Sequence, residues 1–319
     1  MSTNYQKDYT QGVFVGMVCN AKCGFCNAQV SKIDDENTGL RKEEDYQTFY
    51  SFERIKNTVL ERKNNGAGCI IYEGGDFSMH PEIFNILEFG NSLGLKQTFQ
   101  TNGIRLNDLK FVKKLKEHKI EDMNFSLHAY EEELSDKIMG VPGAYKKTIQ
   151  GMLNCKKEGI NTIVNFVLVK DNVNQLEGFL LLMIKLGVNL LNITMYVPVD
   201  LFPEEFHDKY LANPNDVGVE ISKILKLYNE LQKISENKLK ITMKFHNIGR
   251  CIFDKEYHNY DFQFDLDRRK PKGEKYNFDT GFYMKKDCEN CIYFNDCTGF
   301  TSKYVIKYGE DFIKPILSK

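Results

Sequence analysis

The sequence predicts an α/β protein built on a parallel β-sheet, followed by a small cysteine-rich region. Three observations point to this fold class. Six apolar, β-branched runs alternate with amphipathic helical stretches, the pattern changes near residue 236, and three cysteines gather close to the C-terminal end. Parallel neighbours need crossover connections, which are usually helices. With 319 residues, 42% of them hydrophobic, the chain can bury one large core and an appended small domain.

The predicted strands are rich in Val, Ile, Phe and Tyr. They are residues 12–18, 68–73, 96–101, 122–128, 162–169 and 191–197. The helical stretches between and after them lie near 51–64, 81–93, 106–118, 143–158, 173–187 and 216–235. Periodicity alone does not decide between a partly closed barrel and an open doubly wound sheet. In either case functional side chains collect beyond the C-terminal ends of the strands.

The C-terminal part is different in character. After a strand-like run at 239–245 the sequence becomes loop-rich, and Cys288, Cys291 and Cys297 follow. We therefore expect two domains, residues 1–235 and a small metal-stabilised domain over residues 236–319.

Charge and hydropathy exclude some classes of function. The 43 basic and 44 acidic residues give a net charge of −1, which provides no general attraction to nucleic acid or to anionic membranes. The N-terminal residues are polar, and the most apolar window, 178–191, is interrupted by Lys185 and is too short to span a bilayer. We expect a cytoplasmic protein without a membrane partner. In that reducing compartment clustered cysteines favour metal or redox chemistry over disulfides.

Three cysteines lie directly after the first predicted strand, at Cys19, Cys23 and Cys26. Three thiolates can hold three corners of an iron–sulfur cube, whereas a fully ligated 4Fe–4S cluster uses four cysteines. The missing fourth ligand would leave one iron for a small molecule. The alternatives are a zinc site, which needs a further ligand, or thiols that pack as small hydrophobic groups.

The segment "CNAKCGFC" resembles the C-x3-C-x-aromatic-C signature of the radical S-adenosylmethionine (radical SAM) superfamily. In the expected order, "YEGGD" at 72–76 is similar to the glycine-rich segment of that family, "TNG" at 101–103 to the end of its third strand, and "SLHA" at 126–129 to the end of its fourth. The resemblance covers roughly residues 10–235. It implies a partial (β/α)6 barrel that binds a 4Fe–4S cluster and S-adenosyl-L-methionine, cleaves the latter to a 5′-deoxyadenosyl radical, and abstracts a substrate hydrogen.

Carried over position by position, the resemblance makes Cys19, Cys23 and Cys26 the cluster ligands. It also assigns contacts to S-adenosylmethionine. These would be Phe25, Gly74, Gly75, Asp76, Ser126, Asn165, Tyr196 and Val197. Asp76 departs from the family, which has Glu there, and Ser126 and Asn165 can equally be ordinary polar residues at strand ends. The resemblance assigns no catalytic residue beyond these.

The C-terminal cysteines, together with Cys251, provide four thiols. Their spacing resembles the auxiliary-cluster domains called Twitch or SPASM, and the absence of a cysteine after Cys297 favours the shorter Twitch form with one 4Fe–4S cluster. The alternative is a structural zinc site with four thiolate ligands. Among the four cysteines, Cys251 is the ligand whose assignment the sequence spacing supports least. A saturated auxiliary cluster indicates electron transfer, hence an oxidoreductase-type reaction. Cys69 and Cys155 are expected in the core.

The resemblance implies an oxidative modification of a ribosomally made peptide, with an electron donor such as flavodoxin or ferredoxin. Only about 11 residues precede the first strand, so a peptide substrate would call for a separate recognition protein. The alternatives are oxidation of a small hydroxylated metabolite, RNA modification, or a non-catalytic metal-binding regulatory protein. Near-neutral charge makes nucleic acid the less favoured partner.

Overall fold

The computed structural model describes residues 10–26, 48–198, 204–263 and 282–317. They form two compact units. The first comprises residues up to 127 with 131–164 and 186–189, and the second comprises 128–130, 165–185 and 190 onward. Within the described residues, no helix has both the length and the apolar character needed to cross a membrane.

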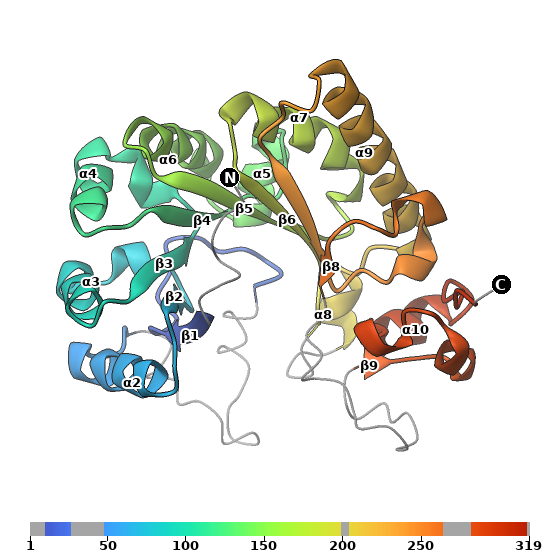
Figure 1. Cartoon of the computed structure of the whole chain (residues 1–319), viewed down its shortest axis with the longest axis horizontal. Helices are drawn as coiled ribbons and strands as arrows, with labels where there is room; N and C mark the ends of the chain where they lie inside the picture. Colours follow the sequence, from blue (N-terminus) through green and yellow to red (C-terminus); the bar gives the residue numbers. More distant parts are fainter. Residues whose placement is uncertain (1–9, 27–47, 199–203, 264–281, 318–319) are drawn as a thin grey trace. The chain divides into compact units, whose positions relative to one another are not determined.

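The first unit is a parallel sheet with helices between its strands. Its strands are β1 (Thr10–Phe14), β2 (Cys69–Glu73), β3 (Lys96–Thr101) and β4 (Asp122–Ser126). Its helices are α2 (Phe52–Asn64), α3 (Ile83–Ser92), α4 (Leu109–Glu117), α5 (Glu132–Met139) and α6 (Ala144–Lys157). Figure 1 shows α2, α3, α4 and α6 along one face of these strands. β1 pairs with β2 in register Thr10 to Cys69, and β2 with β3 in register Cys69 to Lys96.

Aromatic packing under the ends of β2 and β3 fixes the site-bearing loops. The Tyr72 and Phe77 rings stack with centroids 4.4 Å apart, and Phe77 meets Phe99 edge-on at 5.3 Å. All three side chains are buried. Phe77 begins a short 3-10 helix, Phe77–Met79, that directly follows the glycine-rich segment. Its burial therefore holds Gly74, Gly75 and Asp76 at the strand end.

The second unit continues the strand order. β5 (Asn161–Leu168) runs from the first unit into the second, which contains α7 (Leu176–Leu186) and the parallel strands β6 (Leu190–Met195), β7 (Thr242–His246) and β8 (Phe262–Gln263). It also contains α8 (Glu204–Asp208), α9 (Pro214–Ile234), α10 (Ser302–Tyr308), and the antiparallel pair β9 (Phe282–Tyr283) and β10 (Phe300–Thr301). In strand order, β1 to β8 follow the chain.

The six predicted strands and six predicted helices all form, with bounds shifted by a few residues. The sequence missed α5, α8 and α10, which are short. β7 follows the predicted domain boundary at 236 yet pairs in parallel with β6 over five positions. The division at 235/236 remains a prediction.

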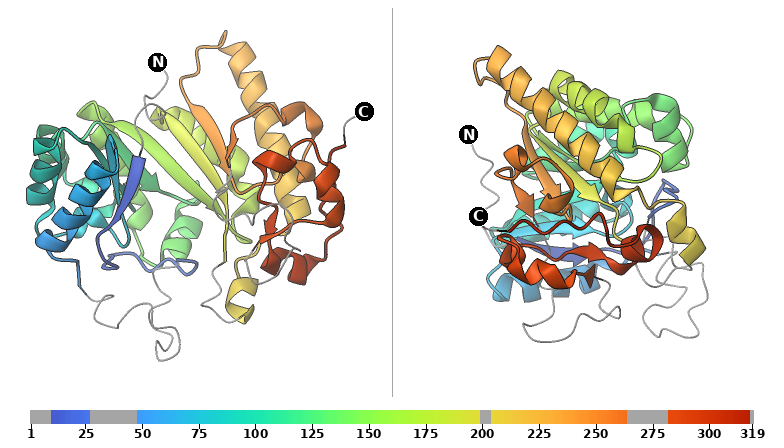
Figure 2. Two further views of the ribbon diagram at one scale, coloured as in Figure 1. Left: turned by 60° about the horizontal axis from the view of Figure 1, so that its bottom comes forward. Right: turned by 90° about the vertical axis from the view of Figure 1, so that its right-hand side faces the viewer.

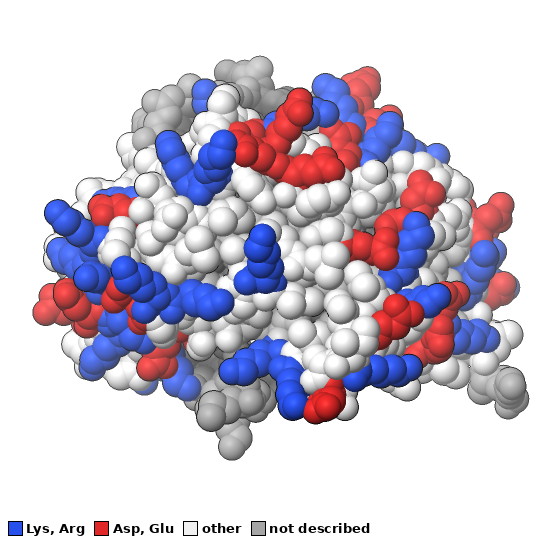
Figure 3. All heavy atoms as spheres, turned by 90° about the horizontal axis from the view of Figure 1, so that it is seen from above, with Lys and Arg blue, Asp and Glu red and all other residues white. Residues whose placement is uncertain are grey.

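The C-terminal residues pack beside α8 and the start of α9, as both views in Figure 2 show. Tyr308 Oη donates to the Leu211 carbonyl at 2.8 Å, and Lys307 Nζ reaches both the Asp208 carbonyl (2.6 Å) and its carboxylate (2.9 Å). Basic and acidic side chains are interspersed over the face in Figure 3, in keeping with the net charge of −1.

Candidate functional site

The loop that carries Cys19, Cys23 and Cys26 is held by backbone hydrogen bonds to the segment after β2. Val15 N donates to Glu73 O (2.9 Å), Gly75 N to Gly16 O (2.8 Å) and Asp76 N to Val18 O (2.8 Å). The pairing of β1 with β2 thus continues past both strands and ends one residue before Cys19. The first thiol is therefore placed by main-chain bonds, independently of any ligand.

This continuation requires glycine at two positions. A Cβ on Gly74 would lie 2.2 Å from Gly16 O, and one on Gly75 would lie 2.1 Å from Val18 O. Gly74 also has a φ of +129°, which L-residues rarely adopt. The family resemblance assigns Gly74 and Gly75 to cofactor contacts, and the close approach of the cysteine loop is a separate reason for glycine at both positions.

Asp76 joins the loops that follow β2 and β3. Its carboxylate accepts from Ser78 N (3.0 Å) and Ser78 Oγ (2.6 Å), from Thr101 Oγ1 (2.9 Å) and from Asn102 N (2.9 Å). The side chain is buried, and burial raises its pKa in spite of these donors. The carboxylate is thus engaged by protein groups, which leaves the backbone as the part of Asp76 suited to a cofactor.

Asn102 contacts the first thiol directly. Its Nδ2 group donates to Asn20 Oδ1 at 2.6 Å and lies 3.5 Å from Cys19 Sγ, while Ala21 N donates to the same sulfur at 3.4 Å. Hydrogen bonds to cluster sulfurs tune the potential of iron–sulfur centres. In the sequence, Asn102 is marked only by its place in the "TNG" segment, directly after β3. Its contact with Cys19 could not be predicted from that segment alone.

The middle of the cysteine loop rests on α5. Lys22 N donates to the Met139 carbonyl at 2.8 Å, and a Cβ on Gly140 would lie 2.7 Å from Lys22 O. Gly140 is the left-handed residue that ends α5. The loop is therefore held within the first unit both before Cys19, at Val18, and between Cys19 and Cys23, at Lys22.

The three thiols influence one another. Burial, followed by the charges of Asp76 and Cys26, raises the pKa of Cys19 to about 11. Burial, followed by the charges of Cys26 and Cys19, raises the pKa of Cys23 to about 12. Thiolates in such a site need a positive partner, and an iron–sulfur core supplies one. Two half-buried thiols, Cys23 and Cys26, and the more exposed Cys19, whose sulfur receives N–H donors, fit that group.

In the described ranges, no group of three or more His, Cys, Asp or Glu side chains has an arrangement suited to a metal ion.

The other predicted cofactor contacts are distributed over both units. Phe25 and Ser126 belong to the first and are partly exposed, while Asn165, Tyr196 and Val197 belong to the second. Asn165 Oδ1 accepts from Asn192 Nδ2 at 2.8 Å. Tyr196 is buried, its N–H donates to Leu168 O (3.2 Å), and its carbonyl accepts from Tyr304 Oη (3.0 Å). These bonds fix the backbone that leads to Val197.

His128 follows β4 and is buried. Its Nδ1 accepts from Val167 N at 3.1 Å, and burial lowers its pKa to about 4. The ring is therefore neutral at neutral pH. Its hydrogen bond joins the segment after β4 to β5, which is a structural role.

Four cysteines line one cavity in the second unit. Cys251, Cys288, Cys291 and Cys297 line one small cavity of about 30 Å³, together with aromatic and aliphatic side chains. Burial first, and then the charges of the other thiols, raises the pKa of Cys288 to about 12. The structure thus brings Cys251 to the other three, although the sequence spacing gave that residue the least support.

Backbone N–H groups point at the sulfurs of this cavity. Gly299 N donates to Cys297 Sγ at 3.3 Å, and Ile316 N to Cys291 Sγ at 3.4 Å. Burial raises the pKa of Cys251, and a hydrogen bond from the Lys314 backbone partly offsets this. Donors of this kind favour thiolate over thiol. By contrast, Cys69 and Cys155 are buried in β2 and α6, as expected of core thiols.

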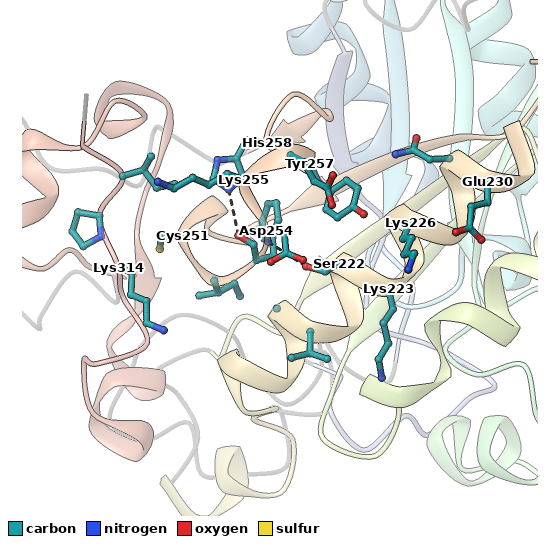
Figure 4. A pocket seen from close by; sticks show the side chains of 18 of the residues that line it. Ser222, Lys223, Lys226, Glu230, Cys251, Asp254, Lys255, Tyr257, His258 and Lys314 are labelled. Carbon is teal, nitrogen blue, oxygen red and sulfur yellow. Dashed lines mark hydrogen bonds between the residues drawn. The ribbon is translucent and has the colours of Figure 1, made fainter. Parts of the chain in front are cut away.

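A groove of about 970 Å³ lies beside this cavity and shares Cys251, Pro315 and Ile316 with it. One wall is α9, and the other is formed by residues 251–258. Lysines 223, 226, 255 and 314 alternate there with Glu230 and Asp254, so the groove has mixed charge (Figure 4).

The family model described as the Radical SAM superfamily matches residues 13–183. Among curated proteins, the chain is similar to a probable GTP 3′,8-cyclase of Sulfurisphaera tokodaii, with 30% identity over 196 residues. The match covers 60% of this chain and 58% of that relative's own length.

Among solved structures, the fold is similar to that of Streptococcus suis SuiB bound to S-adenosylmethionine. The TM-score is 0.62 at 16% identity, covering 97% of this chain and 76% of SuiB. SuiB has also been solved with its precursor peptide SuiA. Native anSMEcpe with bound AdoMet and the Cp18Cys peptide gives a TM-score of 0.57 at 16% identity, covering 73% of this chain and 63% of the other. These likenesses confirm the predicted partial (β/α) barrel.

Replacing Gly74 by Ala tests the close approach of the two loops. Gly66→Ala is a matched control, because Gly66 also has a positive φ (+91°) but no atom within 4 Å of the added Cβ. We expect Gly66→Ala to lower the free energy of unfolding by about 1–3 kcal/mol. Gly74→Ala should cost about 1–3 kcal/mol more, because the backbone at Gly16 must move.

Urea unfolding and iron content after anaerobic reconstitution measure both effects. Only Gly74→Ala should lower the iron bound through Cys19, Cys23 and Cys26. Equal stability and equal iron in the two variants would contradict the role assigned to the loop pairing.

Proposed function

The chain belongs to the radical SAM superfamily, and from that premise we propose that Cys19, Cys23 and Cys26 hold a 4Fe–4S cluster at which S-adenosylmethionine is cleaved. When bound, that cluster supplies one electron, which splits the cofactor into methionine and a 5′-deoxyadenosyl radical that takes a substrate hydrogen. The observation that carries the proposal is the cysteine loop, which main-chain bonds hold in place and which receives N–H donors on Cys19 Sγ.

The glycine-rich segment has a defined part in this proposal. Because the N–H groups of Gly75 and Asp76 bond the cysteine loop, carbonyl oxygens are what the segment can offer to a cofactor. Carbonyls accept from a protonated amine such as that of the methionine moiety. Asp76 then acts by holding the loops after β2 and β3 together.

The remaining predicted cofactor contacts are kept as proposals for each unit separately. In the first unit, Phe25 would lie beside the adenine and Ser126 would reach the ribose or the carboxylate. In the second unit, Asn165 would face the adenosine and the backbone at Tyr196 and Val197 would meet the adenine edge, with the Tyr196 carbonyl held by Tyr304. Excluding water around the radical is the general contribution of the protein.

We further propose that Cys251, Cys288, Cys291 and Cys297 hold an auxiliary 4Fe–4S cluster in a Twitch-like region. Four thiols line one cavity, and backbone N–H groups donate to Cys297, Cys291 and Cys251. A fully ligated cluster has no open iron for substrate, so its role is to accept an electron from the substrate radical. The reaction is then a net oxidation, with the proton released to solvent. A structural zinc is the alternative for the same ligands.

For the substrate we propose a ribosomally made peptide, supported by the fold likeness to SuiB and anSMEcpe, both solved with peptides. A small metabolite is the second candidate, because the curated relative is named for its action on GTP. Flavodoxin or ferredoxin would supply the electron, and the cytoplasm remains the expected location.

Changing Cys19, Cys23 and Cys26 together to Ala tests the primary cluster. The unchanged protein should carry about eight irons per chain, and the variant about four, those of the auxiliary cluster. Formation of 5′-deoxyadenosine with dithionite should be lost in the variant. Continued cleavage would place the reductive chemistry elsewhere, and four irons plus one zinc in the unchanged protein would remove the auxiliary cluster.

Cys251→Ala tests the fourth auxiliary ligand, with Cys155→Ala as its control in α6. We expect the Cys251 variant to lose up to about four irons and all product while still releasing 5′-deoxyadenosine. The control should keep about eight irons. Circular dichroism checks the fold, since losing a metal can unfold a small domain. Full product from a folded Cys251 variant would rule out this ligand's role in electron transfer.

The substrate class can be decided by isotope transfer. Any short peptide found to be encoded next to the gene is the probe: in deuterated form, it should pass deuterium to 5′-deoxyadenosine and be recovered oxidised. Deuterium transfer from GTP or a small alcohol, with none from the peptide, would favour the metabolite. Mass spectrometry of both products gives the answer.

A further inference from the structure

We propose that Arg250 is the counter-charge of the auxiliary cluster and raises its reduction potential. This rests on the auxiliary cluster proposed above. Arg250 directly precedes Cys251 and begins the same short 3-10 helix, Arg250–Ile252. Its side chain lines the cavity that the four cysteines surround.

The guanidinium is held in place by three contacts. Nε donates to the His258 carbonyl at 3.2 Å. The guanidinium carbon lies 4.7 Å from the centre of the Tyr293 ring and 5.0 Å from that of Phe262. Tyr293 lies between Cys291 and Cys297 in the chain, so the segment that bears two of the thiols also packs on the arginine.

One part of the guanidinium remains unused by the protein. Nη1 is buried and has no hydrogen-bond partner among the described residues. A buried donor without a partner costs about 1–3 kcal/mol, and more on a charged group. An anionic cluster in the adjoining cavity would satisfy the charge and offer sulfur as an acceptor. Arg250 thus has the position and the free donor that such a group requires.

The electrostatic consequence has a definite sign. Four thiolates make a 4Fe–4S centre anionic, and reduction adds a further negative charge. A fixed positive charge stabilises the more negative state more strongly, so it raises the reduction potential. Arginine stays charged at every accessible pH, which suits a permanent counter-charge. In the proposed reaction, the substrate radical loses one electron and one proton, and the cluster gains that electron more readily.

The test uses the variant with Cys19, Cys23 and Cys26 changed to Ala, in which the auxiliary cluster is the sole proposed centre. Arg250→Gln and Arg250→Met remove the charge, and the Met side chain can still pack between the two rings. Arg250→Lys keeps a charge, and Arg54→Gln alters an arginine that lies over the Tyr50 ring in the first unit. Anaerobic redox titration followed by electron paramagnetic resonance measures the midpoint.

At a fixed potential, we expect the ratio of reduced to oxidised cluster to fall about tenfold in the Gln and Met variants. For a one-electron couple this is a midpoint about 59 mV more negative. The Lys variant should recover part of the shift, and Arg54→Gln should show none. Loss of iron from both neutral variants but not from Lys would equally support the counter-charge.

Three results would overturn the inference. Neutral variants with about four irons and an unchanged midpoint would refute it and leave the auxiliary cluster intact. Loss of iron from the Lys variant together with the neutral ones would give Arg250 a purely structural role. Zinc or no metal in the parent variant would remove the auxiliary cluster itself, and the counter-charge with it.

Discussion

The main-chain bonds between the loops after β1 and β2 are the constraint on which the candidate site depends. Gly75 N to Gly16 O and Asp76 N to Val18 O extend strand pairing into segments that would otherwise be free to move. Backbone bonds tolerate little displacement, so the position of Cys19 follows from the sheet. The two loops can approach this closely only because residues 74 and 75 are glycines. The Asp76 carboxylate also accepts hydrogen bonds from Thr101 and Asn102, and these bonds hold the loop after β3 against the loop after β2.

Both sets of thiols share one design. In each, desolvation raises the pKa of a thiol, Cys19 in the first set and Cys288 in the second, and N–H donors lower the cost of the thiolate. They differ in what completes them. The first has three thiols and an amide donor from Asn102, whereas the second has four thiols and the guanidinium of Arg250, whose Nη1 atom is buried. Three thiols would leave one iron open, as the proposed cofactor-binding role requires. Four thiols would leave none open, as the proposed electron-accepting role requires.

Much of the fold could be predicted because most of the strands carry apolar or β-branched residues and alternate along the chain with amphipathic helices. α5 was missed because its eight residues carry three acids and only a short apolar face. The three N-terminal thiols could be found because they lie close together in the chain. The fourth member of the C-terminal set could not be secured, since Cys251 lies 37 residues before Cys288 and only folding brings them together. Asn102 is marked in the sequence only by its place in the "TNG" segment, and Arg250 has no sequence signature, because the role of each depends on neighbours distant in the chain.

Tyr304 makes the region after the last cysteines a structural part of the second unit. Its hydroxyl donates to the carbonyl of Tyr196, at the end of β6, and both side chains are buried. A shortened chain without α10 would leave that carbonyl without this donor and expose the apolar surface around it. For protein engineering, the C-terminal region is therefore a poor candidate for exchange as a cassette. Grafting it onto a related scaffold would succeed only where the recipient offers an equivalent acceptor at its sixth strand.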